Sequence, residues 1–132
     1  MRVITLNANG IRSAQRKGVF GWLARQKADF LCLQETKAQR GDLKQEADFA
    51  PRGWMAFFND AKKKGYAGVA LYARKQPDEV LTTLGNKEFD DEGRYVEVRL
   101  GSLSVVSLYL PSGSAGPERQ IGRAHAGNPG SA

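Results

Sequence analysis

The stretch "DFLCLQETK", residues 29–37, decides the fold that we expect for this chain. Its apolar run from Phe30 to Leu33 predicts a short strand that is buried on both faces. Glu35 and Lys37 follow directly after this strand. Ligands of open α/β sheets gather beyond the carboxyl ends of the strands. Glu35 is therefore either a residue of a functional site or a charged residue of a solvated turn, and this stretch alone favours neither.

The segment before this strand predicts a strand and a helix. "RVITLN", residues 2–7, alternates in polarity and is rich in β-branched residues, which is typical of a strand. An Asn-Gly turn follows, and Ser13 can cap a helix from about Ala14 to Lys27. The order strand, helix, strand predicts that the two strands pair in parallel.

The segment after Lys37 predicts four more strands. Residues 54–58 and 68–73 read as two strands joined by a polar loop. Residues 94–100 and 103–110 read as two more, and Gly101-Ser102 between them predicts a tight hairpin. The fold class that we expect is α/β, with a mixed β-sheet packed on a helix. Residues 121–132 carry no apolar periodicity, so we expect a disordered tail after a domain of residues 1–120.

Length and charge narrow the class of protein. The chain has 132 residues, which suits one domain, and its 20 Lys and Arg against 14 Asp and Glu give a net charge of +6. A basic balance favours polyanionic partners such as nucleic acid. The single cysteine, Cys32, lies in the buried run and fits a reducing compartment. We see neither a signal peptide nor a membrane span, and we expect a soluble cytoplasmic protein that binds no membrane.

Five polar side chains lie at or just beyond the ends of predicted strands: Asn7, Asn9, Glu35, Tyr109 and Ser112. If these strands share one sheet edge, the five side chains converge there. A carboxylate with an amide oxygen suits a hard cation such as Mg²⁺, whereas a buried Cys32 and a single histidine argue against zinc. Each residue alone also has a purely structural interpretation, as a strand-end amide or a half-buried aromatic.

Taken together, five blocks of sequence carry a resemblance: "LNANGIRSA" (6–14), "FLCLQETKAQ" (30–39), "GYAGVALYAR" (65–74), "DEGRYVEV" (91–98) and "SLYLPSGSAGPERQ" (107–120). In order and spacing they resemble the exodeoxyribonuclease III family, the abasic-site endonucleases of the endonuclease/exonuclease/phosphatase superfamily. The resemblance runs from Met1 to Gln120. It implies the N-terminal half of a four-layered, DNase I-like α/β sandwich.

The resemblance also implies roles for single residues. Glu35 would bind the catalytic Mg²⁺, for which Mn²⁺ is a possible substitute, and Asn7 would help to order the metal site. Tyr109 would contact the scissile phosphate. The residues that it places against DNA are Arg12, Lys37, Tyr66, Arg94, Asn9 and Ser112, with the lysines at 62–64 as less specific phosphate contacts. Lys37 would in addition tune the Glu35 carboxylate, and Asn9 and Ser112 fall where other branches carry different polar residues.

The implied function is a Mg²⁺-dependent DNA repair nuclease in which water directly attacks the phosphodiester. Its partner would be duplex DNA with abasic sites or 3′ ends, and full-length members are usually monomeric. Members of the family continue into a second half that carries an Asp-x-Asn pair and an Asp-His pair. Neither pair occurs here, so we expect a truncated or frameshifted chain that lacks activity and exposes an apolar sheet face.

Two other functions stay open. The first is a catalytically inactive fragment that binds nucleic acid weakly through its positive charge, with a steep dependence on salt. The second is a phosphatase or phosphodiesterase of the same superfamily that acts on a lipid or inositol phosphate.

Overall fold

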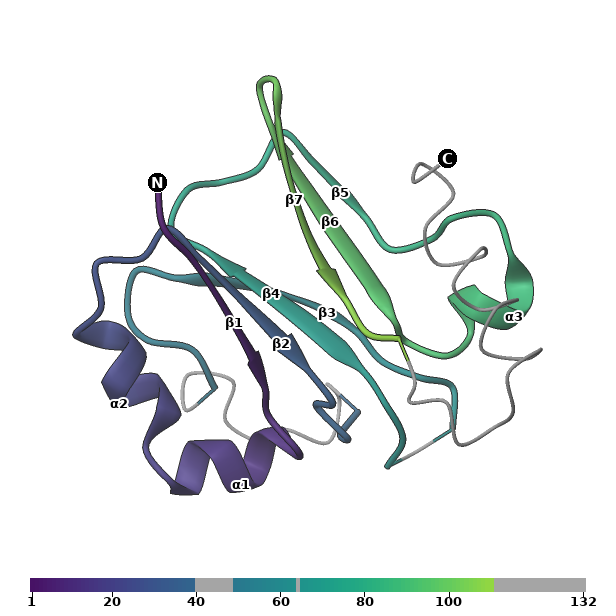
Figure 1. The fold of residues 1–132 in the computed structure, drawn as a ribbon, viewed down its shortest axis with the longest axis horizontal. Coiled ribbons are helices and arrows are strands. Elements are labelled where there is room, and N and C mark those ends of the chain that lie inside the picture. Colours follow the sequence, from purple (N-terminus) through teal and green to yellow (C-terminus); the bar gives the residue numbers. More distant parts are fainter. Residues whose placement is uncertain (40–48, 64, 111–132) are drawn as a thin grey trace.

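Two β-sheets form the framework of the part of the chain that the computed structural model describes, residues 1–39, 49–63 and 65–110 (Figure 1). The first sheet has the strand order β1-β2-β4-β3 and consists of β1 (Val3–Asn7), β2 (Phe30–Gln34), β3 (Met55–Asn59) and β4 (Val69–Ala73). The second sheet has the order β5-β6-β7 and consists of β5 (Glu79–Leu81), β6 (Tyr95–Leu100) and β7 (Leu103–Leu108).

The first sheet is mixed, as predicted. β1 runs parallel to β2, whereas β4 runs antiparallel to both β2 and β3. A parallel pair needs a crossover connection, which is supplied here by α1 (Ile11–Arg16) and α2 (Val19–Ala24). The helices bury Ile11, Phe20 and Leu23 against this sheet, so the prediction of a mixed sheet packed on helix is confirmed.

The prediction of one helix from Ala14 to Lys27 is wrong in its bounds and its continuity. The helical segment begins at Ile11, where the backbone N–H donates to Thr36 O at 2.8 Å. It breaks at Gly18, which has a left-handed backbone with φ of 89°. Glycine adopts this conformation without the steric cost that a Cβ would bring, so the chain turns there and a second helix starts at Val19.

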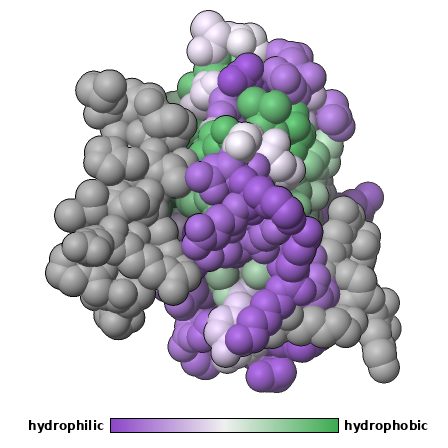
Figure 2. All heavy atoms as spheres, turned by 90° about the vertical axis from the view of Figure 1, so that its right-hand side faces the viewer, coloured by the Kyte–Doolittle hydropathy of each residue, from purple (hydrophilic) through white to green (hydrophobic). Residues whose placement is uncertain are grey.

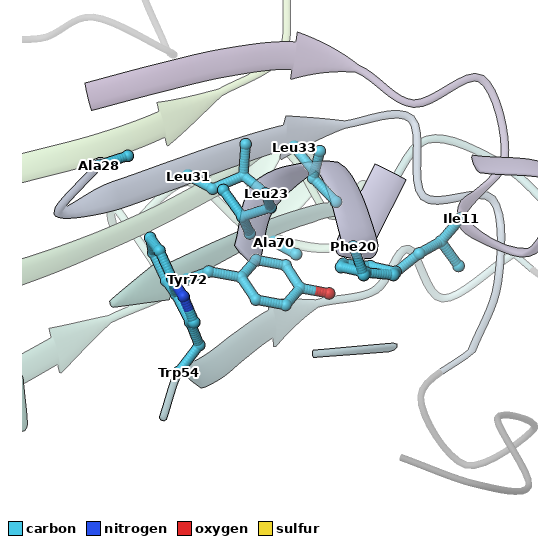
Figure 3. Close-up of a cluster of buried hydrophobic side chains, with 9 residues drawn as sticks. All are labelled: Ile11, Phe20, Leu23, Ala28, Leu31, Leu33, Trp54, Ala70 and Tyr72. Carbon is cyan, nitrogen blue, oxygen red and sulfur yellow. The ribbon is translucent and has the colours of Figure 1, made fainter. Parts of the chain in front are cut away.

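Side chains of the first sheet alternate between two hydrophobic cores. Leu31 and Leu33 face the helices together with Tyr72, whose ring lies between Phe20 and Trp54 (Figure 3). The Tyr72 and Phe20 ring centroids are 5.6 Å apart. Tyr72 also donates a hydrogen bond to Phe49 O at 2.6 Å, so the polar end of this buried ring is satisfied.

The opposite face of the first sheet packs against the second sheet. Phe30 and Cys32 of β2 lie in one core cluster with Val96, Val98 and Val105 of the second sheet. The expectation that one apolar sheet face is exposed is therefore wrong, because the second sheet, which the strand pattern alone did not separate from the first, covers it. Exposed apolar residues are instead scattered: Val3 and Leu6 lie on β1 at the rim of the first sheet, and Val80 and Val106 lie on strands of the second.

In the segment that forms the second sheet, one feature was predicted and two were not. Leu100 pairs with Leu103 across the Gly101-Ser102 loop, and Gly101 has a positive φ of 58°, so the tight hairpin is confirmed. The three-residue β5 and the short helix α3 (Lys87–Asp90) were not predicted. Figure 2 shows the side that carries α3, where hydrophilic residues predominate around a small apolar patch. No helix among the described residues is long and apolar enough to cross a membrane.

Candidate active site

Three strands from the two sheets end close together. Asn7 at the end of β1 lies opposite Gln34 at the end of β2, so Glu35 is the first residue beyond this pair. Tyr109 is the first residue after β7 of the second sheet. The predicted convergence of strand ends is thus present in the structure for the asparagines, the glutamate and the tyrosine, and Ser112 lies outside the described residues.

The turn that carries Glu35 is strained and firmly held. Glu35 and Lys37 have left-handed backbones with φ of 55° and 52°, a conformation that costs a non-glycine residue on the order of 1–3 kcal/mol. Four backbone hydrogen bonds hold the turn: Gly10 N to Glu35 O (2.8 Å), Ile11 N to Thr36 O (2.8 Å), Thr36 N to Gly68 O (3.1 Å) and Lys37 N to Ala67 O (2.8 Å). Strain that is held in this way is typical of functional sites rather than of solvated turns.

The carboxylate of Glu35 belongs to a chain of contacts with an aromatic ring and a buried cation. The Tyr109 hydroxyl donates to Glu35 Oε1 at 2.9 Å. The Arg94 guanidinium lies 5.2 Å from the centre of the Tyr109 ring. It also forms an ion pair with Glu92. Arg94 is 7% exposed, and its Nη1 has no hydrogen-bond partner among the described residues. A buried N–H without a partner is costly, which makes Arg94 a candidate for binding an anion.

These contacts determine the protonation state of Tyr109. Burial is the main cause that raises the pKa of Tyr109, and the hydrogen bond to Glu35 and its negative charge raise it further. The positive charge of Arg94 opposes this shift in part. The phenol therefore remains neutral at ordinary pH and remains a donor towards Glu35.

The two asparagines and Lys37 form a second chain beside Glu35. Asn9 N donates to Asn7 Oδ1 at 2.9 Å, and Lys37 Nζ donates to Asn9 Oδ1 at 2.6 Å. Lys37 thus donates to the side-chain amide oxygen of Asn9. Because an amide oxygen has two lone pairs, Asn7 Oδ1 can accept this backbone bond and still face a ligand.

The donor set fits a hard divalent cation that keeps most of its waters. Mg²⁺ is often bound through one or two carboxylates, with water in the remaining positions. Glu35 supplies one carboxylate and Asn7 one amide oxygen, and no group of three His, Cys, Asp or Glu side chains gathers anywhere in the described ranges. Both are oxygen donors of the kind that hard divalent cations bind, whereas zinc sites are built mostly from sulfur and nitrogen ligands.

Two of the residues predicted to contact DNA share a hollow near this site. Tyr66 and Arg94 line a cavity of about 370 Å³ together with Lys63, Asp91 and Glu92. Lys63 Nζ lies 4.0 Å from the centre of the exposed Tyr66 ring. Lys62 instead pairs with Asp91, Arg12 is exposed on α1, and residue 64 lies outside the described residues.

Two polar residues next to the site, Gln34 and Ser107, were not predicted. Gln34 Nε2 donates to Thr5 Oγ1 at 3.1 Å and to Ser107 Oγ at 3.3 Å. Ser107 is fully buried and donates to Leu33 O at 3.2 Å. The one available signal was a serine at an inward position of an otherwise apolar strand, since buried hydroxyls need a partner.

Comparisons with known proteins point in one direction. A profile of the Endonuclease/Exonuclease/phosphatase family matches residues 4–130. An exodeoxyribonuclease of Bacillus subtilis is 37% identical over 120 residues, which are 90% of this chain and 46% of that protein. A DNA-(apurinic or apyrimidinic site) endonuclease of Dictyostelium discoideum is 31% identical over 120 residues, which are 90% of this chain and 33% of that protein.

A solved structure shows the same fold. An AP endonuclease from Archaeoglobus fulgidus superposes with a TM-score of 0.78 and 29% identity, over 100% of this chain and 52% of that one. The expected DNase I-like α/β fold is thereby confirmed. The chain spans about a third to a half of the length of these relatives.

Proposed function

Because this chain belongs to the endonuclease/exonuclease/phosphatase family, we propose that its site serves a metal-dependent DNA repair nuclease. The substrate would be duplex DNA, cut beside abasic sites and at 3′ ends. The bond broken would be a phosphodiester, with water as the nucleophile. The names of the matched relatives, an exodeoxyribonuclease and an abasic-site endonuclease, support this choice over a lipid or inositol phosphatase.

One observation carries the proposal, the hydrogen bond from Tyr109 to Glu35 with the Arg94 guanidinium against the tyrosine ring. The phenol holds one carboxylate oxygen of Glu35, so the other oxygen keeps a fixed direction. A hydroxyl and a buried cation then lie beside one carboxylate, which suits a phosphate group that must be bound and neutralised as negative charge grows.

Each residue has a defined task in this proposal. Glu35 and Asn7 would hold Mg²⁺ or Mn²⁺, which when bound neutralises charge on a phosphoryl oxygen. When the substrate is present, Tyr109 would turn its one proton from Glu35 to the phosphate, and Arg94 would offer Nη1, which has no partner among the described residues, to a backbone phosphate. Lys63 and Tyr66 at the rim of the hollow would contact the next phosphates along the strand.

The test is incision of a labelled duplex that carries one abasic site, by the full 132-residue chain. The missing second-half motifs favour an inactive chain, whereas the Glu35–Tyr109–Arg94 arrangement favours an active one. If this arrangement suffices, the chain nicks with Mg²⁺ but not with EDTA, and Tyr109→Phe loses about 10²-fold or more, as for the removal of one donor to developing charge. Glu35→Ala tests the carboxylate and also reveals a contaminating nuclease, whose activity would survive the substitution. Nicking that persists in Glu35→Ala, or a folded wild-type chain that does not nick, would contradict the catalytic role.

A second candidate function is electrostatic binding of nucleic acid without cleavage. It is favoured by the net charge of +6 and by the lack of any cluster of three His, Cys, Asp or Glu side chains within the described residues. This function predicts an affinity for duplex DNA that falls steeply with salt and is indifferent to EDTA. It also predicts that Glu35→Ala binds DNA as tightly as the unsubstituted chain, or more tightly, because a negative charge has been removed. Filter binding at several salt concentrations separates the two candidates.

A further inference from the structure

The two strand ends that supply Glu35 and Tyr109 are joined a second time, next to the site. Gln34 ends β2 and directly precedes Glu35. Ser107 lies two residues before Tyr109, so both side chains are on the inward face of β7, where Ser107 is fully buried. Gln34 Nε2 donates to Ser107 Oγ at 3.3 Å. This bridge therefore lies beside the hydrogen bond from Tyr109 to Glu35 and runs between the same two strands.

The relative position of these two strands is not set by a backbone ladder. β2 and β7 contact one another but belong to different sheets. Strands of one sheet are held in register by backbone hydrogen bonds, whereas packed sheets meet through side chains. Phe30, Cys32 and Val105 form the apolar part of this contact. Apolar burial is non-directional, so it holds the sheets together without fixing the distance between two particular atoms at their ends.

The Gln34 amide adds a directional contact between the sheets. Its N–H occupies the oxygen of Ser107, and the hydroxyl proton of Ser107 goes to Leu33 O at 3.2 Å. Hydrogen bonds weaken steeply when their angles change, and consecutive bonds strengthen one another. The end of β7 is thus held to the end of β2 by two linked hydrogen bonds.

The remaining contact of the amide leads back to the first sheet. Gln34 Nε2 also lies 3.1 Å from Thr5 Oγ1 on β1. β1 and β2 are already joined by their parallel ladder, so this contact holds the amide in place rather than setting the distance between the strands. An amide nitrogen carries two N–H groups, and the protein uses both of them here. Gln34 therefore acts on the site through its neighbours and not by binding a phosphate itself.

We propose that Gln34 is a positioning residue of the candidate site: its amide fixes β7 against the end of β2 and so keeps the Tyr109 hydroxyl within hydrogen-bonding distance of Glu35. The purpose of this arrangement rests on the proposed function, because a carboxylate with a fixed direction serves a cation or a phosphate rather than the fold. Groups that orient a metal ligand from behind often govern the affinity of the site for its metal.

The experiment is a double-mutant cycle with Gln34→Met and Tyr109→Phe, in which urea unfolding of the full chain is measured. Methionine has about the size of glutamine but makes neither hydrogen bond, and Tyr109→Phe removes only the hydroxyl. If Gln34 keeps this hydroxyl in place, its removal matters less once Gln34 is replaced. We expect Tyr109→Phe to raise the unfolding equilibrium constant by a factor about fivefold smaller in the Gln34→Met background than in the unsubstituted chain. A residue that only adds stability gives the same factor in both backgrounds.

The matched control is Val98→Ala, which removes a fully buried apolar side chain from the same core between the sheets. It should destabilise the chain and leave the factor for Tyr109→Phe unchanged. Ser107→Ala removes the other end of the bridge, so it should reproduce the coupling and serves in place of Gln34→Met if that variant does not fold. Equal factors with and without the bridge overturn the proposal, as does a coupling that Val98→Ala shows to the same degree.

Binding of Mn²⁺, followed by the electron paramagnetic resonance of the free ion, tests the purpose of the arrangement separately. We expect Gln34→Met to raise the dissociation constant about tenfold, and Val98→Ala to leave it unchanged. An unchanged constant in Gln34→Met overturns the positioning role. A folded, unsubstituted chain that binds no Mn²⁺ contradicts the proposed function instead, and the cycle then decides alone whether Gln34 positions Tyr109.

Discussion

At the scale of single residues, the turn that carries Glu35 depends on a glycine on the neighbouring strand connection. Gly68 has a φ of 86°, and a Cβ built on it would lie 2.1 Å from Thr36 Oγ1. Thr36 is 1% exposed and follows Glu35 directly, so it has no room to move aside. The close approach of Gly68 is what permits the two backbone bonds between this connection and the turn.

Substitution of Gly68 by alanine should therefore destabilise the fold through two effects, the left-handed backbone and the contact with Thr36. Gly53 isolates the first effect, because it has a φ of 89° with no atom within 4 Å of a built Cβ. We expect Gly68→Ala to lower the free energy of unfolding by about 1–3 kcal/mol more than Gly53→Ala, the usual cost of overpacking. Urea denaturation of both variants measures the difference. Equal effects would mean that Thr36 yields without cost.

The contact between Glu35 and Tyr109 makes a second prediction at this scale. The carboxylate raises the pKa of Tyr109 through its hydrogen bond and its charge, in addition to the effect of burial. Glu35→Gln removes the charge, so the phenol should ionise at a lower pH than in the unsubstituted chain. Ultraviolet absorbance during an alkaline titration follows this change, and Tyr109→Phe identifies which transition belongs to Tyr109. An unchanged transition in Glu35→Gln would contradict the contact.

The site was predictable from the sequence only in part. The position of Glu35 follows from the apolar run that precedes it, and the placement of Tyr109 from the end of an alternating strand. The stacking of Arg94 on Tyr109 and the bridge from Gln34 to Ser107 were not predictable from local pattern. Both join residues whose proximity depends on how two sheets are layered, which no periodicity along the chain encodes.

At the scale of elements, the second sheet is fastened by a polar cluster on its outer face. Glu97 on β6 accepts hydrogen bonds from Tyr95 on the same strand, from Arg99 Nε at 2.8 Å and from Ser104 Oγ on β7 at 3.1 Å. Arg99 reaches Glu79 on β5 at 3.3 Å. All three strands of this sheet are thus joined through one carboxylate.

This cluster makes the stability of the sheet depend on pH. The hydrogen bond from Tyr95, with those from Arg99 and Ser104, lowers the pKa of Glu97 in the folded chain although burial opposes the shift. An unfolded glutamate has a pKa of about 4.3, so the stabilisation is complete above that pH and is lost as the pH falls through the lower folded pKa.

Glu97→Gln should therefore be less stable than the unsubstituted chain near neutral pH, and the gap should close on acidification below about 4.3. Thermal unfolding of both proteins across the acid range measures the gap. A gap that stays constant down to the acid-unfolded state would show that the ionised carboxylate contributes nothing.

Among the elements, long and strongly patterned strands were predicted well and short ones were missed. β1, β4, β6 and β7 fall inside predicted segments, and β2 and β3 each extend one residue past theirs, because each carries a run of apolar or alternating residues. β5 and α3 have three and four residues, too few to show a period. The helix was predicted as one piece because a single glycine destabilises a helix by only about 1 kcal/mol. That cost is too small to tell from the sequence whether the helix continues through Gly18 or breaks there.

At the scale of the whole molecule, the chain's single thiol reports on whether the two sheets stay together. Cys32 is 3% exposed between the sheets, and burial raises its pKa to about 11. Only the thiolate reacts readily, so both burial and protonation protect it in the folded chain. We expect a disulfide reagent to label Cys32 no faster than the chain unfolds, with the rate rising with urea as global unfolding does. Rapid labelling in the absence of urea would mean that the sheets separate easily.

The layering of the molecule was the least predictable feature. The predicted strands indicated a mixed sheet but not which strands belong to it. Because the strands divide into two sheets, a hydrophobic core lies on the face of the first sheet that was expected to be exposed. Pairing between strands distant in sequence, such as β2 with β4, depends on tertiary contacts that local pattern does not contain.

The two cores on either side of the first sheet share its backbone but no side chain. Leu31 can therefore be replaced without altering the surroundings of Cys32, its neighbour in the chain, since each contacts a different set of residues. The energetic effects of substitutions in the two cores should add, because residues without common partners rarely interact. Over evolutionary time, the odd and even positions of β2 can therefore change independently, each substitution being compensated by changes within its own core.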